Sequence, residues 1–131
     1  MLWYDIEHYA WSANKANNQA FIKEMIDEGQ RLGVHAGIYS SYYGWDEVVG
    51  RSWTYAHDKG LPVWYAHYDG KAAFSDFSSF GGWSKPNMKQ YLGDKSSCGV
   101  GIDYNWYPSA TDATEKVHAI SMPRLNMSVV L

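Results

Sequence analysis

Short segments with strand-like patterns alternate along the chain with helical segments, and this alternation constrains the fold more than any other feature. The strand-like segments are residues 2–7, 34–40 and 63–68. Residues 16–32 repeat apolar side chains every three or four positions, which predicts a helix, and Gly33 follows as its C-terminal cap. Strands that alternate with helices favour a parallel sheet with the helices on its outer face. The sequence therefore predicts an α/β fold.

The remaining segments complete the predicted order β-α-β-α-β-loop-β-β. They are short helices at residues 45–49 and 51–58, a long loop at residues 69–85, and two short strands at residues 88–91 and 101–106, parted by a turn around residues 93–99. Thr111 and Asp112 can cap a further helix that extends to Ile120 and that Pro123 ends. The segment after Pro123 is either a packed strand or a disordered tail.

Composition and charge argue against several classes of function. The 131 residues carry a net charge of −3 without a cluster of Lys and Arg, so nucleic acid is not expected as a partner. No apolar run approaches the ~20 residues of a membrane span, so no membrane is expected either. The single cysteine, Cys98, forbids an internal disulfide and a CxxC site. The five histidines lack metal-ligand spacing, so neither a metal nor a cofactor is expected.

Two acidic residues of the first predicted strand, Asp5 and Glu7, form the sharpest chemical feature of the sequence. Residues two apart on a strand project from the same face, with Cα atoms about 6–7 Å apart. Repulsion and burial then raise one pKa, which leaves a protonated acid beside an ionised carboxylate. Glycosidic bond cleavage needs such a pair. On spacing alone, an exposed strand end with two solvated acids remains an open alternative.

The carboxyl ends of the predicted strands collect further polar and aromatic side chains. Active sites of parallel β/α sheets gather at these ends. The residues concerned are Glu7, Tyr39, Tyr65 to Asp69, Gln90, Tyr91, Asp103 and Asn105. Acids, amides and tyrosine hydroxyls around one mouth suit a sugar as the ligand. His67 can join this mouth, where a structural or substrate-facing role is favoured over a metal ligand.

Several short motifs occur in an order that resembles glycoside hydrolase family 25, the Chalaropsis-type lysozymes. They are LWYDIE at residues 2–7, GIYSS at 37–41, LPVWYAHY at 61–68, QY at 90–91 and GIDYN at 101–105. The loop motifs SDF at residues 75–77 and FGGWSKP at 80–86 extend the likeness. The resemblance covers about residues 2–108.

The resemblance implies part of a TIM-like (β/α)5(β)3 barrel, in which the strand of Asp5 and Glu7 is the fourth of eight. Residues 1–108 are then a truncated lysozyme domain with strands four to eight, and residues 109–131 are an unassigned C-terminal tail unlike the family. A further acidic residue of the family, on its first strand, has no counterpart here. The five strands leave two open sheet edges, through which self-association is expected.

The implied activity is that of an N-acetylmuramidase, which hydrolyses the β-1,4 bond between N-acetylmuramic acid and N-acetylglucosamine of bacterial peptidoglycan. Glu7 is implied as the general acid, Asp5 as the group that stabilises positive charge, and Asp103 as a further acid of the cleft. The predicted substrate-binding residues are Tyr39, Tyr65, His67, Gln90 and Asn105.

Two alternatives to a muramidase stay open, because truncation can abolish activity. One is a non-catalytic remnant that binds peptidoglycan or chitooligosaccharides, and the other is a non-functional translation product. The full-length family is implied to be secreted or lysosomal/phagosomal. No signal peptide is expected in this chain, because residues 1–4 lead directly to Asp5 without a basic start or an apolar segment.

Overall fold

The computed structural model describes residues 1–108. Their helices and strands follow the chain in the order β1 (Leu2–Ile6), α1 (Lys15–Arg31), β2 (Ala36–Ser40), α2 (Tyr42–Val48), α3 (Tyr55–Asp58), β3 (Val63–Ala66), β4 (Met88–Ser97) and β5 (Val100–Trp106). This order confirms the predicted α/β class. The predicted tail at residues 109–131, with its helix over Thr111–Ile120, lies outside the described residues.

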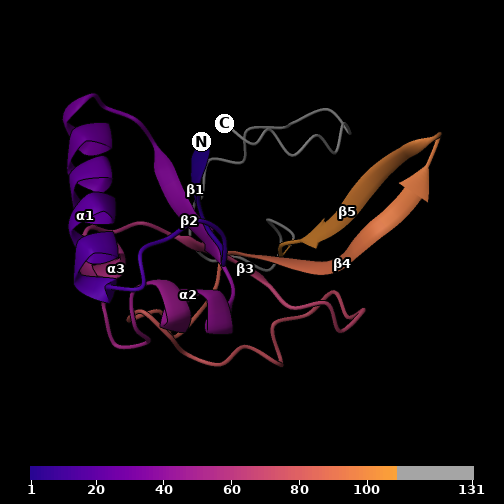
Figure 1. Ribbon diagram of the computed structural model, residues 1–131. Helices are drawn as coiled ribbons and strands as arrows, with labels where there is room; N and C mark the ends of the chain where they lie inside the picture. Colours follow the sequence, from indigo (N-terminus) through magenta and orange to yellow (C-terminus); the bar gives the residue numbers. More distant parts are fainter. Residues whose placement is uncertain (109–131) are drawn as a thin grey trace.

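The five strands form one sheet in the order β1-β2-β3-β4-β5, which curls as half of a barrel. Strands β1 to β4 are parallel, as predicted, whereas β5 runs antiparallel to β4. The reason is the turn between them, because Cys98 and Gly99 both have positive φ, at 52° and 77°. Two such residues make the tight turn of a hairpin, which returns the chain directly alongside itself. Figure 1 shows this ribbon extending away from the helices.

Strand β4 is longer than the sequence pattern indicates. It continues to Ser97, although a turn was expected at Gly93 and Asp94. Asp94 does adopt a positive φ of 56°, and the β4–β5 register shifts between Leu92 and Lys95. Gly93 and Asp94 therefore mark an irregularity within the hairpin, where the sequence predicts a turn.

The helices begin where a side chain caps them. The Asn14 side chain accepts a hydrogen bond from the Ala16 N–H, so α1 starts within one residue of its predicted position. The Ser41 side chain accepts from the Gly44 N–H, and α2 consequently starts at Tyr42, earlier than predicted. The predicted helix at residues 51–58 shrinks to α3. No helix within residues 1–108 combines the length and apolar character that crossing a membrane requires.

The two faces of the sheet carry different side chains. Ile6, Ile38 and Val63 belong to the buried core that the sheet shares with Ile22 of α1 and Trp45 of α2. In Figure 1, α1 and α3 both lie to the left of β1 and β2. The opposite face carries the rings of Trp3, Tyr39 and Trp64, with centroids 5.6 Å apart for Trp3–Trp64 and 4.5 Å for Tyr39–Trp64. We call this second face the inner face.

The long loop between β3 and β4 completes the core. As predicted, the part at residues 69–85 holds no regular strand or helix, and only an isolated bridge joins Phe80 to Trp83. Phe80 and Trp83 are buried, and the Phe77 ring lies 4.9 Å from the Tyr65 ring. The loop thus packs its aromatic side chains on the same face as the helices.

Candidate active site

The carboxyl ends of β1 to β3 lie at one end of the sheet, beside the first residues of β4. Glu7 follows the last residue of β1, and Gln90 pairs with Ala66 at the end of β3. Asp103 reaches the same edge although β5 is antiparallel. Because β4 runs on to Ser97 before it turns, the middle of β5 returns beside Gln90, which pairs with Asn105. The predicted gathering of Glu7, Gln90, Asp103 and Asn105 is therefore present in the fold.

Asp5 shares the inner face with aromatic side chains. It pairs with Tyr39, which in turn pairs with Trp64, and laterally paired residues of parallel strands point to the same face. Asp5 is exposed, whereas Tyr39 is buried. Burial, together with the nearby charge of Glu7, raises the pKa of the Tyr39 phenol. Tyr39 therefore stays protonated and acts as a hydrogen-bond donor.

The carboxyl groups of Asp5 and Glu7 are hydrogen-bonded to each other. Desolvation raises the pKa of Glu7, and the charges of Asp5 and Asp103 raise it further. Desolvation also raises the pKa of Asp5, but the hydrogen bond with Glu7 acts to lower it. All of these influences on Glu7 act to raise its pKa, so Glu7 is the better placed of the two groups to carry a proton.

The Asp103 carboxylate is held by two N–H donors. Its Oδ1 accepts from the Asp94 backbone N–H at 3.0 Å, and its Oδ2 accepts from the Gln90 Nε2 at 3.3 Å. These bonds hold Asp103 where it acts electrostatically on Glu7.

Gln90 is the centre of the hydrogen bonding at this edge, and only 3% of it is exposed. Its Oε1 accepts from the Tyr39 hydroxyl at 2.5 Å and from the Tyr68 hydroxyl at 2.6 Å. Two donors on one amide atom identify that atom as oxygen, so the Nε2 must face Asp103. Tyr68 is a site residue that the predicted substrate-binding set omits, although it belongs to the predicted strand end Tyr65 to Asp69.

Asn105 completes this group on the inner face. Its Nδ2 donates to the Asp103 carbonyl at 3.5 Å, and its buried Oδ1 has no hydrogen-bond partner among residues 1–108. The structure thus brings together six of the eight predicted residues. These are Asp5, Glu7, Tyr39, Gln90, Asp103 and Asn105.

Tyr65 and His67 contact a different acid. The Tyr65 hydroxyl donates to Asp76 Oδ1 at 2.9 Å, and His67 Nδ1 lies 2.5 Å from Asp76 Oδ2. Strand alternation places Tyr65 on the helix-covered face, opposite Trp64, and Tyr65 is 4% exposed. The structure therefore does not bring these two side chains to the Glu7 edge as expected. Their role as substrate contacts stays a prediction.

Lys89 holds a second group of charged side chains, which we call the Lys89 cluster and which consists of Lys89, Asp69, Asp76, Tyr65 and His67. The Lys89 side chain is fully buried, and its Nζ donates to Asp69 at 2.8 Å and to Asp76 at 2.7 Å. Burial acts to raise the pKa of both aspartates, but the hydrogen bonds from Lys89 and its neighbours outweigh it and hold both pKa values below their usual range.

The sequence analysis missed this cluster. A usable signal existed, since a lysine inside a strand of a parallel sheet must be buried and so needs anionic partners. Ligand atoms of His67, Asp69 and Asp76 lie within 4.8 Å of one another, a spacing that a metal ion could use. The Lys89 ammonium already pairs with both carboxylates, so the group is an ion-pair network.

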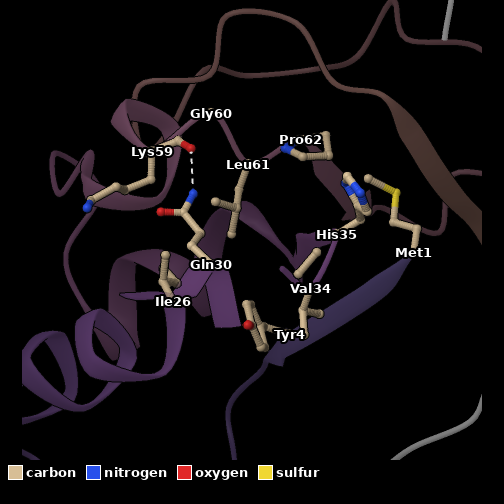
Figure 2. Close-up of a pocket in the computed structure, with 11 residues that line it drawn as sticks. Met1, Tyr4, Ile26, Gln30, Val34, His35, Lys59, Gly60, Leu61 and Pro62 are labelled. Atoms are coloured by element: carbon tan, nitrogen blue, oxygen red, sulfur yellow. Dashed lines mark hydrogen bonds between the residues drawn. The ribbon is translucent and has the colours of Figure 1, made fainter. Parts of the chain in front are cut away.

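A hollow of about 220 Å³ lies at the opposite end of the sheet. Figure 2 shows its lining side chains around the starts of β1 and β2, with Gln30 donating to the Lys59 carbonyl at 2.9 Å. The lining residues are Met1, Tyr4, Ile26, Gln30, Val34, His35, Ala36, Lys59, Gly60, Leu61 and Pro62. This set contains no carboxylate, so the hollow lacks the acid that hydrolysis of a glycoside needs.

Comparison with known proteins identifies the family. The family model described as Lysozyme-like protein 1 matches residues 1–91. The chain belongs to this lysozyme-like family. The match covers the acid pair and Gln90, and it stops before Asp103. The resemblance to glycoside hydrolase family 25 is confirmed as well, because similar proteins carry the name GH family 25 lysozyme.

Three relatives of this lysozyme-like chain show how far the similarity extends. "Probable GH family 25 lysozyme 4" of Dictyostelium discoideum is 45% identical over 109 residues, which are 83% of this chain and 50% of the relative. "Lysozyme-like protein 5" of Caenorhabditis elegans is 43% identical over 108 residues, 82% of this chain and 49% of the relative. "Counting factor 45-1" of D. discoideum is 43% identical over 115 residues, 85% of this chain and 37% of the relative.

A solved structure agrees with the fold. The muramidase from Acremonium alcalophilum superposes with a TM-score of 0.58 at 22% identity, covering 84% of this chain and 51% of that one. At this identity the likeness is evidence for the fold alone. The chain spans about half the length of two of these relatives. The share is 50% for the probable lysozyme 4 and 49% for the lysozyme-like protein 5.

Proposed function

We propose that the chain is a muramidase that hydrolyses the β-1,4 bond between N-acetylmuramic acid and N-acetylglucosamine in bacterial peptidoglycan. The observation that carries the proposal is the pair of neighbouring carboxyl groups of Asp5 and Glu7 at the end of β1, where burial and acidic neighbours raise the pKa of Glu7. Cleavage of a glycoside requires one protonated and one ionised carboxyl group flanking the bond. Membership of the lysozyme-like family supports the choice of substrate.

In the proposed reaction Glu7 is the protonated acid and Asp5 is the ionised carboxylate. Glu7 transfers its proton to the glycosidic oxygen, and the bond from that oxygen to the anomeric carbon breaks. The Asp5 carboxylate stabilises the positive charge that develops on the sugar and orients the 2-acetamido group, whose oxygen bonds to the anomeric carbon. That bond closes a five-membered ring on the sugar. Water then attacks the anomeric carbon and opens this ring, and Glu7, now ionised, accepts the proton of that water.

Release of reducing ends from purified peptidoglycan tests the proposal. We expect activity from the 131-residue chain, and we expect Glu7→Gln to lower it at least 100-fold, because glutamine keeps the shape and cannot protonate the leaving oxygen. Glu24→Gln is the matched control, since Glu24 is an exposed residue of α1 and should leave activity unchanged. Equal activity of Glu7→Gln and Glu24→Gln would rule out Glu7 as the acid.

A non-catalytic peptidoglycan-binding module is the second candidate function. Three observations favour it. The chain spans about half the length of its lysozyme relatives, and a relative of similar identity is named a counting factor. The half-buried rings of Trp3 and Trp64 on the inner face can stack on sugar rings. Sedimentation of the chain with insoluble peptidoglycan, without release of reducing ends, would favour this function over hydrolysis.

The position of the chain within a barrel is part of the same proposal. Strands β1 to β5 correspond to strands four to eight of an eight-stranded (β/α)5(β)3 barrel, and the muramidase superposition over 51% of that structure supports this numbering. The protein then acts where peptidoglycan is met, outside the cell or in a lysosome or phagosome. Fractionation of the cells that make it tests this location.

Self-association through the sheet edges follows from the half-barrel. In residues 1–108, β1 and β5 are the edge strands, and each presents unpaired backbone groups. Leu2 beside the β1 edge is 56% exposed. We expect the molar mass in solution to rise above that of a monomer with concentration, as measured by light scattering. A constant monomer mass would contradict pairing at these edges.

A further inference from the structure

Glu7 occupies a position that the sheet itself does not fix. The last paired residue of β1 is Ile6, opposite Ser40, and Glu7 comes directly after it. The segment that follows, residues 8–10, is exposed and contains neither helix nor strand. A side chain at such a strand end depends on local contacts for its direction. Contacts outside the sheet must therefore hold the backbone of Glu7.

Two donors converge on the Glu7 backbone carbonyl. The Trp11 indole Nε1–H donates to it at 2.8 Å, and the Tyr9 backbone N–H donates to it at 3.0 Å. One residue earlier, the Ser40 hydroxyl donates to the Ile6 carbonyl at 2.7 Å. Because the peptide unit is planar, fixing this carbonyl fixes the backbone rotation that sets where the Glu7 side chain points.

Trp11 is itself anchored to the helices. Its ring packs edge-on against Phe21 of α1, with centroids 6.1 Å apart, and it contacts the hydrophobic core. The next residue, Ser12, exchanges two hydrogen bonds with the buried Asn18 side chain at 3.1 and 2.8 Å. Asn18 also donates to the Val48 carbonyl of α2 at 2.8 Å. The Trp11 indole is thus held in place by the helices and lies next to the end of β1.

We propose that Trp11 is a positioning residue, whose indole N–H holds the Glu7 peptide so that the Glu7 carboxyl group stays beside Asp5. The consequence for catalysis rests on the proposed muramidase function, whereas the contact itself does not. The groups that face Glu7 are Asp5 of β1, Tyr39 of β2, Tyr68 after β3 and Asp103 of β5. Release of Trp11 lets Glu7 turn away from this negatively charged surrounding.

The test removes the donor and keeps the ring. In Trp11→Phe, and in a protein with benzothienylalanine at position 11, an apolar ring remains without an N–H. We expect the Glu7 carboxyl titration, followed by NMR of 13C-labelled glutamate, to move to lower pH. The alkaline limb of the pH–activity profile should move the same way. We also expect kcat to fall roughly 10- to 100-fold with KM unchanged, as for a misplaced catalytic group.

Phe21→Leu is the matched control, because it alters the packing of the Trp11 ring and keeps the N–H. It should leave the Glu7 titration where it is in the unchanged protein. If Trp11→Phe fails to fold, the benzothienylalanine protein gives the same readout with the shape of tryptophan preserved. A Glu7 titration unchanged by loss of the N–H overturns the proposal. A chain that releases no reducing ends refutes the proposed function instead, and the NMR titration still decides the role of Trp11.

Discussion

Two groups of carboxylates lie on opposite faces of the same sheet, and they differ in what surrounds them. Asp5, Glu7 and Asp103 meet at the inner face, and the pKa of Glu7 is raised by desolvation and by its acidic neighbours. Asp69 and Asp76 are paired with the fully buried Lys89, and their pKa values are lowered despite burial. The same side-chain chemistry therefore yields an acid on one face and a structural ion pair on the other.

The difference shows how a sheet can separate chemistry from stability. A buried cation stabilises the carboxylates around it and keeps them ionised. Asp69 and Asp76 therefore hold the β3–β4 loop in place and carry no proton to donate. A cluster of acids with no buried cation keeps one proton at the expense of stability. Strand alternation keeps the two environments apart, because Lys89 and Gln90 are adjacent in β4 and point to opposite faces.

The largest effect is expected from removing the cation of the Lys89 cluster. Lys89→Met leaves Asp69 and Asp76 without their shared partner, and breaking a buried ion pair costs about 3 kcal/mol. The free energy of unfolding from urea titration measures this loss. Lys95→Met, on the exposed part of β4, is the control and should change it by less than about 0.5 kcal/mol. Equal stability of the two variants would contradict a structural role for Lys89.

An intermediate effect is expected from pH. The pKa values of Asp69 and Asp76 are lowered in the folded state, so their contribution is present above the unfolded pKa of about 3.9 and is lost as pH falls below it. We expect the chain to lose about 2 kcal/mol of stability between pH 5 and low pH from this source. Asp76→Asn should flatten that dependence, as measured by urea titration at several pH values. A slope unchanged by the substitution would place the acid sensitivity elsewhere.

The smallest effect is expected at the inner face, with the opposite sign. The pKa of Glu7 is raised in the folded state, so its contribution is full below the unfolded pKa and is lost as pH rises through the folded pKa. Glu7→Gln imitates the protonated form and should increase stability at pH 7 by about 0.5 kcal/mol after solvent screening. The gain should vanish below pH 4. A loss of stability at pH 7 would show that Glu7 contributes to folding as an anion.

Much of this arrangement could be predicted from the sequence, because it depends on local patterns. The Asp5–Glu7 spacing places both acids on one strand face. The apolar period of residues 16–32, with Gly33 after it, predicts both ends of α1 to within one residue. Because the carboxyl ends of parallel strands meet at one end of the sheet, Tyr39 and Gln90 could also be assigned to the site.

What the sequence did not predict depends on strand alternation and on loop path. Tyr65 was assigned to the mouth by its place near the end of β3, but the pleat turns its side chain to the other face. The contact of Trp11 with the Glu7 carbonyl depends on the turn at residues 8–10, which no motif specifies. The partners of Lys89 come from a loop without periodicity, so only the three-dimensional structure could identify them.

The contrast between the two carboxylate groups is tested most directly by one NMR titration of the unchanged chain, with the side-chain carboxyl groups labelled with 13C. We predict that Glu7 titrates above the range of an ordinary glutamate, and that Asp76 titrates below the range of an ordinary aspartate. A Glu7 titration within or below the ordinary range of glutamate would contradict the assignment of Glu7 as the acid.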